Sequence, residues 1–192
     1  QGVDISLVKR IKGVFTASFF ANTDLSNNQI ASFYTGAMAY SKDLSLRDIG
    51  ITKDDLVVIS PNDPTAMCKY SSECKNLGIP YSYDPGQQVV RNEPSEIKEG
   101  ILHAQNLFIN DYEYELIQKH TGMNDADIRE AVDYVVITLG ERGSDIWVKD
   151  EEYHIPVVEE TEKADPTGVG DAFRGGFLRG KILGFDWQTC GQ

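Results

Sequence analysis

The middle of the chain alternates short apolar runs with helix-like segments, and this alternation limits the fold more than any other feature. The expected strands lie at 56–60, 81–83, 107–110 and 134–138. The expected helices lie at 65–77, 95–104, 113–121 and 124–131. Strand–helix–strand units of this kind build a parallel sheet with helices on both faces. We therefore expect an α/β fold, a three-layer αβα sandwich around a mainly parallel sheet.

The first 35 residues do not share this alternation. Two segments rich in β-branched and aromatic residues, 14–21 and 29–34, flank the turn-forming run N-T-D-L-S-N-N, which predicts a hairpin or a broken pair of strands. Polar residues recur through both segments, so we expect a small sheet with one wet face that covers a cleft. The chain is therefore expected to divide into a partial β lid at 1–35 and an α/β core at 36–192.

A glycine loop near the end of the chain is the strongest candidate for a functional site. Residues 164–180 read A-D-P-T-G-V-G-D-A-F-R-G-G-F-L-R-G, and the Asp-Pro pair at 165–166 ends the preceding segment before a helix begins. Gly168 and Gly170 let the backbone approach a ligand, and N–H groups at a helix start attract anions. Asp171 beside such a site predicts a base for phosphoryl transfer. Alternatively, Asp171 only stabilises the first helical turn.

Composition argues against several other classes of function. The 192 residues carry a net charge of −12, and nucleic-acid-binding proteins instead carry basic patches. We therefore expect no nucleic-acid partner. No apolar run reaches membrane-spanning length, so we expect a cytoplasmic protein without a membrane partner. Cys68, Cys74 and Cys190 lack metal-ligand spacing, which predicts reduced thiols.

Polar residues follow the expected strands at the point where each strand ends. Asp84 comes directly after the strand at 81–83, and Asn110 closes the strand at 107–110. Ligands of parallel sheets bind beyond the carboxyl ends of the strands. We therefore expect these residues to lie at the sheet edge that the loop before Asp171 also reaches.

The stretch D-P-T-G-V-G-D-A-F-R-G-G-F-L at 165–178 resembles the C-terminal signature of the PfkB, or ribokinase-like, carbohydrate and nucleoside kinases. The usual pattern in that family is Asp-Thr-x-Gly-Ala-Gly-Asp-x-Phe-x-Gly-Gly. This chain departs from it at Pro166 and Val169 and keeps both glycines and the aspartate. The resemblance implies a ribokinase-like fold, with Asp171 as the catalytic base and the 168–171 backbone as an anion hole.

The pair Asn110 and Glu113 has two readings. Asn at the N-cap with Glu three residues later is the spacing of a capping box, which explains both residues without any chemistry. The pair also looks like the Asn-x-x-Glu element of the same family, which implies that Asn110 and Glu113 place Mg²⁺ and that Asn110 contacts ATP. Both roles can hold together.

A second glycine-containing run follows the last expected strand of the alternating region. The residues T-L-G-E-R-G at 138–143 are similar to the family's T-x-G-x-x-G nucleotide loop, although a glycine turn leaving a strand would give the same pattern. The resemblance implies that Thr138, Gly140 and Gly143 lie near the phosphates of ATP, together with Thr167 of the signature.

The run from Phe15 to Met38 looks like the lid segment of bacterial adenosine-kinase-type members. In those members T-D-x-x-x-N-Q-I is followed by an aromatic residue and G-A-M, as it is here. The resemblance implies that Phe15, Gln29 and Phe33 contact the substrate. It also allows a homodimer that forms through the lid.

The resemblance as a whole implies ATP- and Mg²⁺-dependent phosphorylation of a primary hydroxyl, with the 5′-OH of adenosine as the first expected acceptor. Two alternatives remain, a sugar kinase of the ribokinase or fructokinase type and a non-catalytic remnant that serves as a binding or structural module. The match covers the middle and later part of a family enzyme. We therefore expect the opening strands and the closing helices of the family domain to be missing from this chain.

Overall fold

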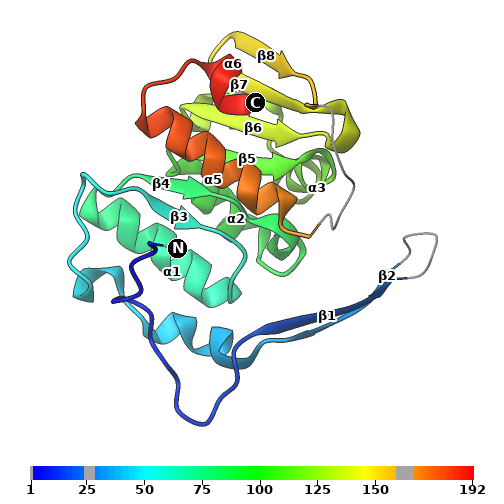
Figure 1. The fold of residues 1–192 in the computed structure, drawn as a ribbon. Coiled ribbons are helices and arrows are strands. Elements are labelled where there is room, and N and C mark those ends of the chain that lie inside the picture. The colour runs from blue at the N-terminus through cyan, green and yellow to red at the C-terminus, as the bar shows by residue number, and fades with distance from the viewer. Residues whose placement is uncertain (1, 24–28, 159–166) are drawn as a thin grey trace.

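The computed structural model describes residues 2–23, 29–158 and 167–192 and is built around one six-stranded sheet (Figure 1). The strands of this sheet are β3 (Val57–Ile59), β4 (Tyr81–Tyr83), β5 (Asn106–Asn110), β6 (Tyr134–Thr138), β7 (Ser144–Val148) and β8 (Glu151–Ile155). They lie side by side in chain order, β3 to β6 parallel and β7 and β8 antiparallel. The expected mainly parallel sheet is confirmed.

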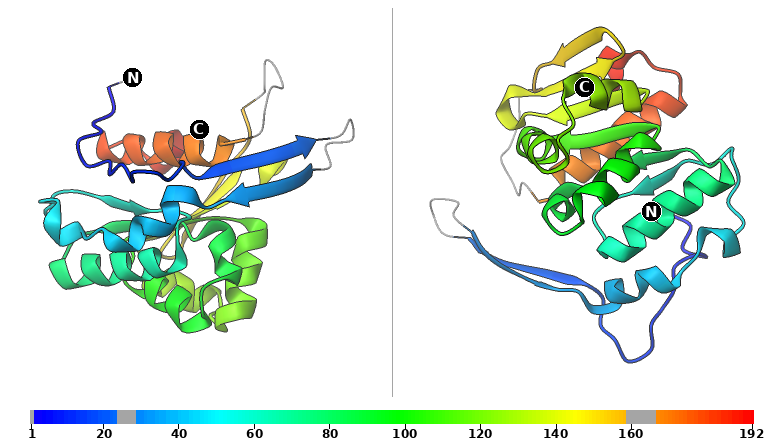
Figure 2. Two further views of the ribbon diagram at one scale, coloured as in Figure 1. Left: turned by 90° about the horizontal axis from the view of Figure 1, so that it is seen from below. Right: turned by 180° about the vertical axis from the view of Figure 1, so that it is seen from behind.

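Helices cover both faces of the sheet, as Figure 2 shows in its left-hand view. One face carries α1 (Pro64–Leu77), α2 (Pro94–Leu102), α3 (Asp111–Thr121) and α4 (Asp125–Ala131), and the other carries α5 (Val169–Ile182) and α6 (Trp187–Gly191). Because parallel strands in chain order are joined by right-handed crossovers, the helices between them fall on one side. The three-layer αβα sandwich is therefore confirmed. No helix of the described residues is long and apolar enough to cross a membrane.

The two central strands supply both hydrophobic layers. Leu107 and Ile109 of β5 pack toward α1 to α4, whereas Phe108 between them packs toward α5. The rings of Phe108 and Phe177 meet edge to face, with centroids 5.3 Å apart, and Phe177 is fully buried. Truncating such a side chain costs about 3–5 kcal/mol. Burial on both faces explains why these strands are continuous apolar runs in the sequence.

Local capping fixes the helix boundaries close to where they are expected. The Asp63 side chain accepts a hydrogen bond from the backbone N–H of Ala66 at 3.1 Å, and Pro64 occupies the first turn of α1. Gly78 ends α1 in the left-handed region at φ 66°. These are common start and stop signals of helices. They explain why the boundaries predicted from the sequence hold to within two residues.

An antiparallel ribbon of β1 (Ser18–Thr23) and β2 (Gln29–Tyr34) projects from the body, so the expected hairpin is confirmed. Its turn, at 24–28, lies outside the described residues. The first strand begins at Ser18 and not at residue 14, because the carbonyl of Phe15 accepts from the N–H of Ala37 at 2.9 Å instead of pairing across the ribbon. Both faces of the ribbon carry aromatic side chains, so neither is wholly polar.

The ribbon is joined to the core by short 3₁₀ helices that the sequence patterns do not predict. The described 3₁₀ segments are η1 (Gly36–Asp43), η2 (Leu46–Asp48), η3 (Gly86–Val90) and η4 (Gly140–Arg142). The carboxylate of Glu73 on α1 accepts from Ser45 Oγ at 2.8 Å and from the N–H of Leu46 at 2.7 Å. This contact, between residues far apart in the chain, fixes the linker on α1.

Candidate active site

A cavity of about 460 Å³ lies at the carboxyl ends of β3 to β6, beside the start of α5. Parallel sheets bind ligands at this edge, and the sequence places its candidate residues there. The polar side chains that line the cavity are Ser60, Asp84, Gln87, Asn110, Glu113, Thr138, Asp171 and Arg174. Gly168 and Gly170 also line it, and Phe108, Ile109 and Phe173 supply apolar wall.

The glycine loop opens α5 as expected. Gly168 is the N-cap at φ 82°, a left-handed conformation that L side chains rarely adopt, and its carbonyl accepts from the N–H of Ala172 at 2.9 Å. Apart from the adjoining residues and the backbone of α5 itself, no atom of the described chain lies within 4 Å of where a Cβ would stand at Gly168 or Gly170. The backbone at the start of α5 can therefore be approached closely by an anion. The side chain of Val169 is exposed and does not line the cavity.

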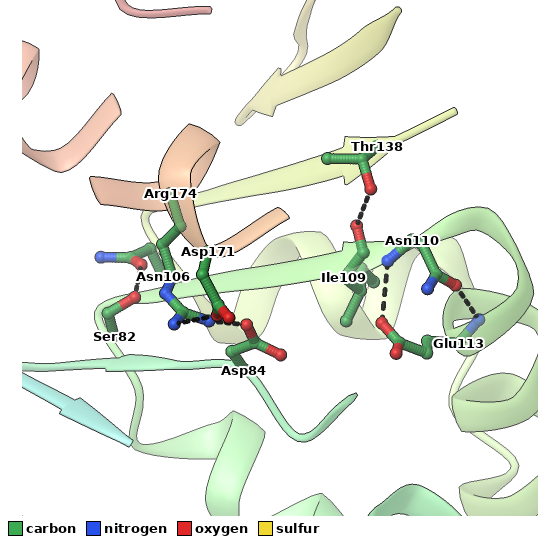
Figure 3. Close-up of polar contacts among 9 residues, drawn as sticks. All are labelled: Ser82, Asp84, Asn106, Ile109, Asn110, Glu113, Thr138, Asp171 and Arg174. Carbon is green, nitrogen blue, oxygen red and sulfur yellow. Dashed lines mark hydrogen bonds and ion pairs between the residues drawn. The ribbon is translucent and has the colours of Figure 1, made fainter. Parts of the chain in front are cut away.

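Asp171 lies in the first turn of α5 and is held by an arginine one turn later. Arg174 Nη2 donates to Asp171 Oδ1 at 2.8 Å, and Arg174 Nη1 donates to Asp84 Oδ2 (Figure 3). The Asp171 side chain is 73% exposed, whereas those of Arg174 and Asp84 are 11% and 19% exposed. An inner ion pair thus supports an outer carboxylate that faces the cavity.

Burial lowers the pKa of the Arg174 guanidinium, because desolvation disfavours the charged form. Arginine nevertheless stays protonated in proteins, so this group remains a cation next to two carboxylates. Removing one partner of this partly buried ion pair is destabilising, because the other charge is left unpaired. Arg174 and Asp84 are therefore structurally dependent on each other.

The D-P-G run at 84–86 has a structural explanation in this site. Its aspartate is the partner of Arg174, and the Asp84 N–H donates to the carbonyl of Ile59 at 2.9 Å. Gly86 has φ +49°, and a Cβ there would stand 2.5 Å from Pro61 Cγ. Glycine is thus required for the close packing of the loops that follow β3 and β4.

Asn110 and Glu113 form the capping box that their spacing predicts. Asn110 Oδ1 accepts from the N–H of Glu113 at 2.8 Å, and Glu113 Oε2 accepts from the N–H of Asn110 at 3.0 Å. Burial raises the pKa of Glu113, and the hydrogen bonds to Asn110 oppose that rise. Because both side chains also line the cavity, the cap does not prevent a second role toward a ligand.

The run at 138–143 meets the cavity only at its first residue, Thr138, which is the last residue of β6. Thr138 lines the cavity and is the register partner of Asn110, whereas Gly140 and Gly143 do not line it. Gly143 has φ +94°, and a Cβ there would stand 2.0 Å from the carbonyl oxygen of Ile155. Packing against β8 therefore explains this glycine. Arg142 Nη2 donates to Asp111 Oδ2 at 2.6 Å, which ties the loop to the start of α3.

The expected substrate residues lie on or near the ribbon. Phe15 precedes β1 and is 82% exposed, Phe33 lies on β2 and is 43% exposed, and neither lines the cavity. Gln29 is the first residue of β2. All three views show the ribbon projecting on the side of the molecule where α5 begins. Thr167 adjoins Gly168 and is exposed.

Asp165 and Pro166 of the signature lie outside the described residues. The pairing of Arg174 with Asp84 is a contact at the cavity that sequence reasoning misses, since the residues are 90 positions apart. Arg174 occupies a variable place in the signature, so nothing in the local spacing marks it.

Within the described ranges, no three or more His, Cys, Asp or Glu side chains are arranged to hold a metal ion by themselves. Mg²⁺ in phosphate-transfer sites is usually held by one or two carboxylates together with the phosphates and water. One carboxylate with a neighbouring amide, as at Glu113 and Asn110, fits that mode of binding. Both are oxygen ligands of the kind that Mg²⁺ prefers.

Comparison with known proteins agrees with this geometry. The pfkB family carbohydrate kinase pattern matches residues 1–192. The nucleoside kinase of Methanocaldococcus jannaschii is 33% identical over 169 residues, which cover 88% of this chain and 55% of that protein. The nucleoside kinase of Methanothermobacter thermautotrophicus is 32% identical over 193 residues, which cover 100% of this chain and 62% of that protein.

Solved structures agree on the fold. A Burkholderia thailandensis nucleoside kinase in complex with inosine is 35% identical, with a TM-score of 0.93 over 99% of this chain and 63% of that one. The M. jannaschii nucleoside kinase, an archaeal member of the ribokinase family, gives a TM-score of 0.85 at 32% identity over 94% of this chain and 59% of that one. The ribokinase-like fold is confirmed. The chain spans about 55–63% of the length of these relatives.

Proposed function

The chain belongs to the pfkB family of carbohydrate kinases, and on this premise we propose that it carries the phosphoryl-transfer site of an ATP-dependent nucleoside kinase. The observation that carries the proposal is the carboxylate of Asp171, which lies in the cavity beside a helix start opened by Gly168 and Gly170. The Burkholderia relative has been solved with inosine and with ADP-inosine, which supports a nucleoside as acceptor and ATP as donor.

Asp171 acts as the base in this proposal. It takes the proton of the acceptor hydroxyl while the hydroxyl oxygen forms a bond to the γ-phosphorus of ATP and the bond from that phosphorus to ADP breaks. The backbone N–H groups of residues 168–171 stabilise the charge that develops on the phosphoryl oxygens. General-base catalysis contributes about 10²–10⁴-fold in rate.

The opposite wall of the cavity is assigned to the metal and the nucleotide. Glu113 and Asn110 would hold Mg²⁺, which would neutralise phosphate charge, and Asn110 and Thr138 would contact the phosphates; all three residues line the cavity. The loop that contains Gly140 and Gly143 lies next to the nucleotide. Thr167, which adjoins Gly168, is assigned to the phosphates as well.

The ribbon serves as a lid over the acceptor. Phe15, Gln29 and Phe33 contact the nucleoside when the ribbon closes, which keeps water away from the transfer. On the opposite face from Phe33, Phe20 and Ile30 are exposed, and we assign that face to a second copy of the chain. Phe20→Ser should then dissociate a dimer in sedimentation equilibrium, whereas Phe33→Ser should raise the KM for the acceptor and leave the dimer intact.

An acceptor panel tests the proposal. The 192-residue chain is incubated with Mg·ATP and adenosine, inosine, cytidine, ribose or fructose, and the phosphorylated product and ADP are measured by chromatography. We expect nucleoside 5′-monophosphate, with adenosine as the best acceptor. A preference for ribose or fructose would make the chain a sugar kinase. No product together with no binding of Mg·ATP would reject the proposal and identify a non-catalytic remnant.

A further inference from the structure

One guanidinium joins two carboxylates that come from different elements at the edge of the cavity. Arg174 binds Asp171 one turn away on α5 and Asp84 at the end of β4. A planar guanidinium has donors at fixed angles and can hold two carboxylates at once, which the single ammonium of lysine does less well. Both α5 and β4 also make other packing contacts in the core.

Asp84 is the fixed end of this arrangement. Its backbone N–H donates a hydrogen bond to the carbonyl of Ile59 on the neighbouring strand. The strand that precedes it, β4, is buried, and Gly86, which follows it, packs tightly on Pro61. Asp171 is the free end, on a first helical turn and mostly exposed. Arg174 therefore holds the Asp171 carboxylate in a fixed position relative to the edge of the sheet. Without this contact the Asp171 side chain would sample several rotamers. A displacement of about 1 Å at a reacting group can cost about 100-fold in rate.

The charges of the three groups suit a base that is neutralised during turnover. With Asp84 and Asp171 ionised and Arg174 protonated, the cluster carries one net negative charge. When Asp171 accepts the hydroxyl proton it becomes neutral and its hold on Arg174 weakens. A buried guanidinium left without a partner would be costly, but Asp84 remains paired with it throughout. Pairing with Asp84 therefore avoids the free-energy cost of an unpaired Arg174 guanidinium during the proton transfer.

We propose that Arg174 is the positioning residue for Asp171, and that Asp84 keeps Arg174 paired while Asp171 takes up the proton. This role rests on the proposed kinase function. Neither residue exchanges atoms with the substrate. Their effect should appear in kcat far more than in the KM for Mg·ATP.

The first experiment measures kcat and KM in four variants of the full chain. Arg174→Met should lower kcat about 100-fold, the scale of a misplaced reacting group, and change the KM for Mg·ATP by less than about 3-fold. Arg174→Lys should recover part of that loss. Asp84→Asn should lower kcat by about 10-fold although Arg174 and Asp171 are both present. The control is Arg179→Gln, an exposed arginine later on α5, which should match the parent chain.

A double variant keeps the test decisive if Arg174→Met folds poorly. Asp84→Asn combined with Arg174→Met leaves no buried unpaired charge, so it should fold. If Arg174 positions Asp171, kcat in the double variant stays as low as in Arg174→Met. If the ion pair only stabilises the fold, the double variant recovers kcat, and the proposal is overturned. Equal changes in kcat and KM, or parent-like kcat in Asp84→Asn, would overturn it too.

The second measurement does not depend on turnover. In ¹⁵N-labelled chain at low temperature, the guanidinium protons of Arg174 should exchange slowly with water because both nitrogens are bonded. Asp84→Asn and Asp171→Asn should each shift these signals, and Arg179→Gln should not. If the parent chain phosphorylates no acceptor, the proposed function fails and these signals alone decide whether the bridge exists. If the guanidinium signals of Arg174 do not shift in Asp171→Asn, Arg174 does not bind Asp171 and the proposal is overturned.

Discussion

The two walls of the cavity are built in different ways. On the α3 wall, Asn110 and Glu113 hold each other through two hydrogen bonds between residues three positions apart. On the α5 wall, Asp171 is held through Arg174 by Asp84, which directly follows β4 and lies 90 positions before Arg174 in the chain. Figure 3 shows Asn110 and Glu113 as one group, at the end of β5, and Asp84, Asp171 and Arg174 as another. The first wall forms with its own helix, whereas the second exists only after α5 has docked on the sheet.

This comparison predicts different failures on the two walls, and the largest concerns Asp171. Asp171→Asn keeps the size of the side chain and removes the base, so kcat should fall by about 10²–10⁴-fold while Mg·ATP still binds. Product formation and calorimetric titration with Mg·ATP measure the two effects. The control is Glu130→Gln, which also replaces a carboxylate by an amide, at an exposed position on α4. If Asp171→Asn turns over at the parent rate, Asp171 is not the base, and the two walls do not differ in their proposed roles.

The contrast also explains what the sequence could predict. The capping box of α3, the strands of the sheet and the start of α5 follow from residues within one or two turns of each other. Periodicity and capping preferences act at that range, so these elements are predictable. The placement of Asp84 at the carboxyl edge of the sheet is predictable for the same reason, because it follows a strand.

What could not be predicted depends on docking. The contact of Asp84 with Arg174 and the anchoring of the 3₁₀ linker by Glu73 join residues 27 to 90 positions apart. No local pattern encodes such a pairing, because it needs the relative placement of two complete elements. The close approach of Gly143 to Ile155 is of the same kind. The sequence marks that glycine, but its spacing suggests a ligand as readily as a neighbouring strand.

Substituting the two glycines of the loop after β6 extends the comparison to long-range packing near the α3 wall. Gly143→Ala should lower the free energy of unfolding by about 3 kcal/mol, the upper end for a strained backbone position, because its Cβ would overlap the Ile155 carbonyl. Gly140→Ala has open space around it and should cost only about 1 kcal/mol for its left-handed backbone at φ +60°. Urea unfolding measures both. Equal losses would show that β8 does not constrain the loop.

Two matched caps separate the structural role of the α3 wall from its proposed ligand role. Asn110 and Asn124 each begin a helix with the same capping box, but only Asn110 lines the cavity. Asn110→Ala and Asn124→Ala should each cost about 1 kcal/mol of unfolding free energy. Only Asn110→Ala should also weaken the binding of Mg·ATP in a fluorescence titration. If both variants bind Mg·ATP like the parent chain, Asn110 is a cap and nothing more.

The smallest expected effect is a pH dependence of stability at Glu113. Burial raises the pKa of this group above its ordinary value of 4.5, so the folded chain binds its proton more tightly than the unfolded chain does. Stability from this group is therefore complete below pH 4.5 and is lost as pH rises through the folded-state pKa. Glu113→Gln keeps an acceptor for the Asn110 N–H and cannot ionise. The unfolding free energy of Glu113→Gln, relative to that of the parent chain, should increase as pH rises and then reach a plateau.

Urea unfolding at a series of pH values measures that gain. Glu96→Gln is the control, since Glu96 occupies the same position in the capping box of α2 and is exposed. The change in unfolding free energy in this control gives the contribution of the cap alone, which is subtracted from that of Glu113→Gln. If the difference in unfolding free energy between Glu113→Gln and the parent chain stays constant with pH, or decreases as pH rises, burial does not raise the pKa of the Glu113 carboxyl. The α3 wall would then be held by its hydrogen bonds alone, and Glu113 would be fully ionised at no cost before any metal arrives.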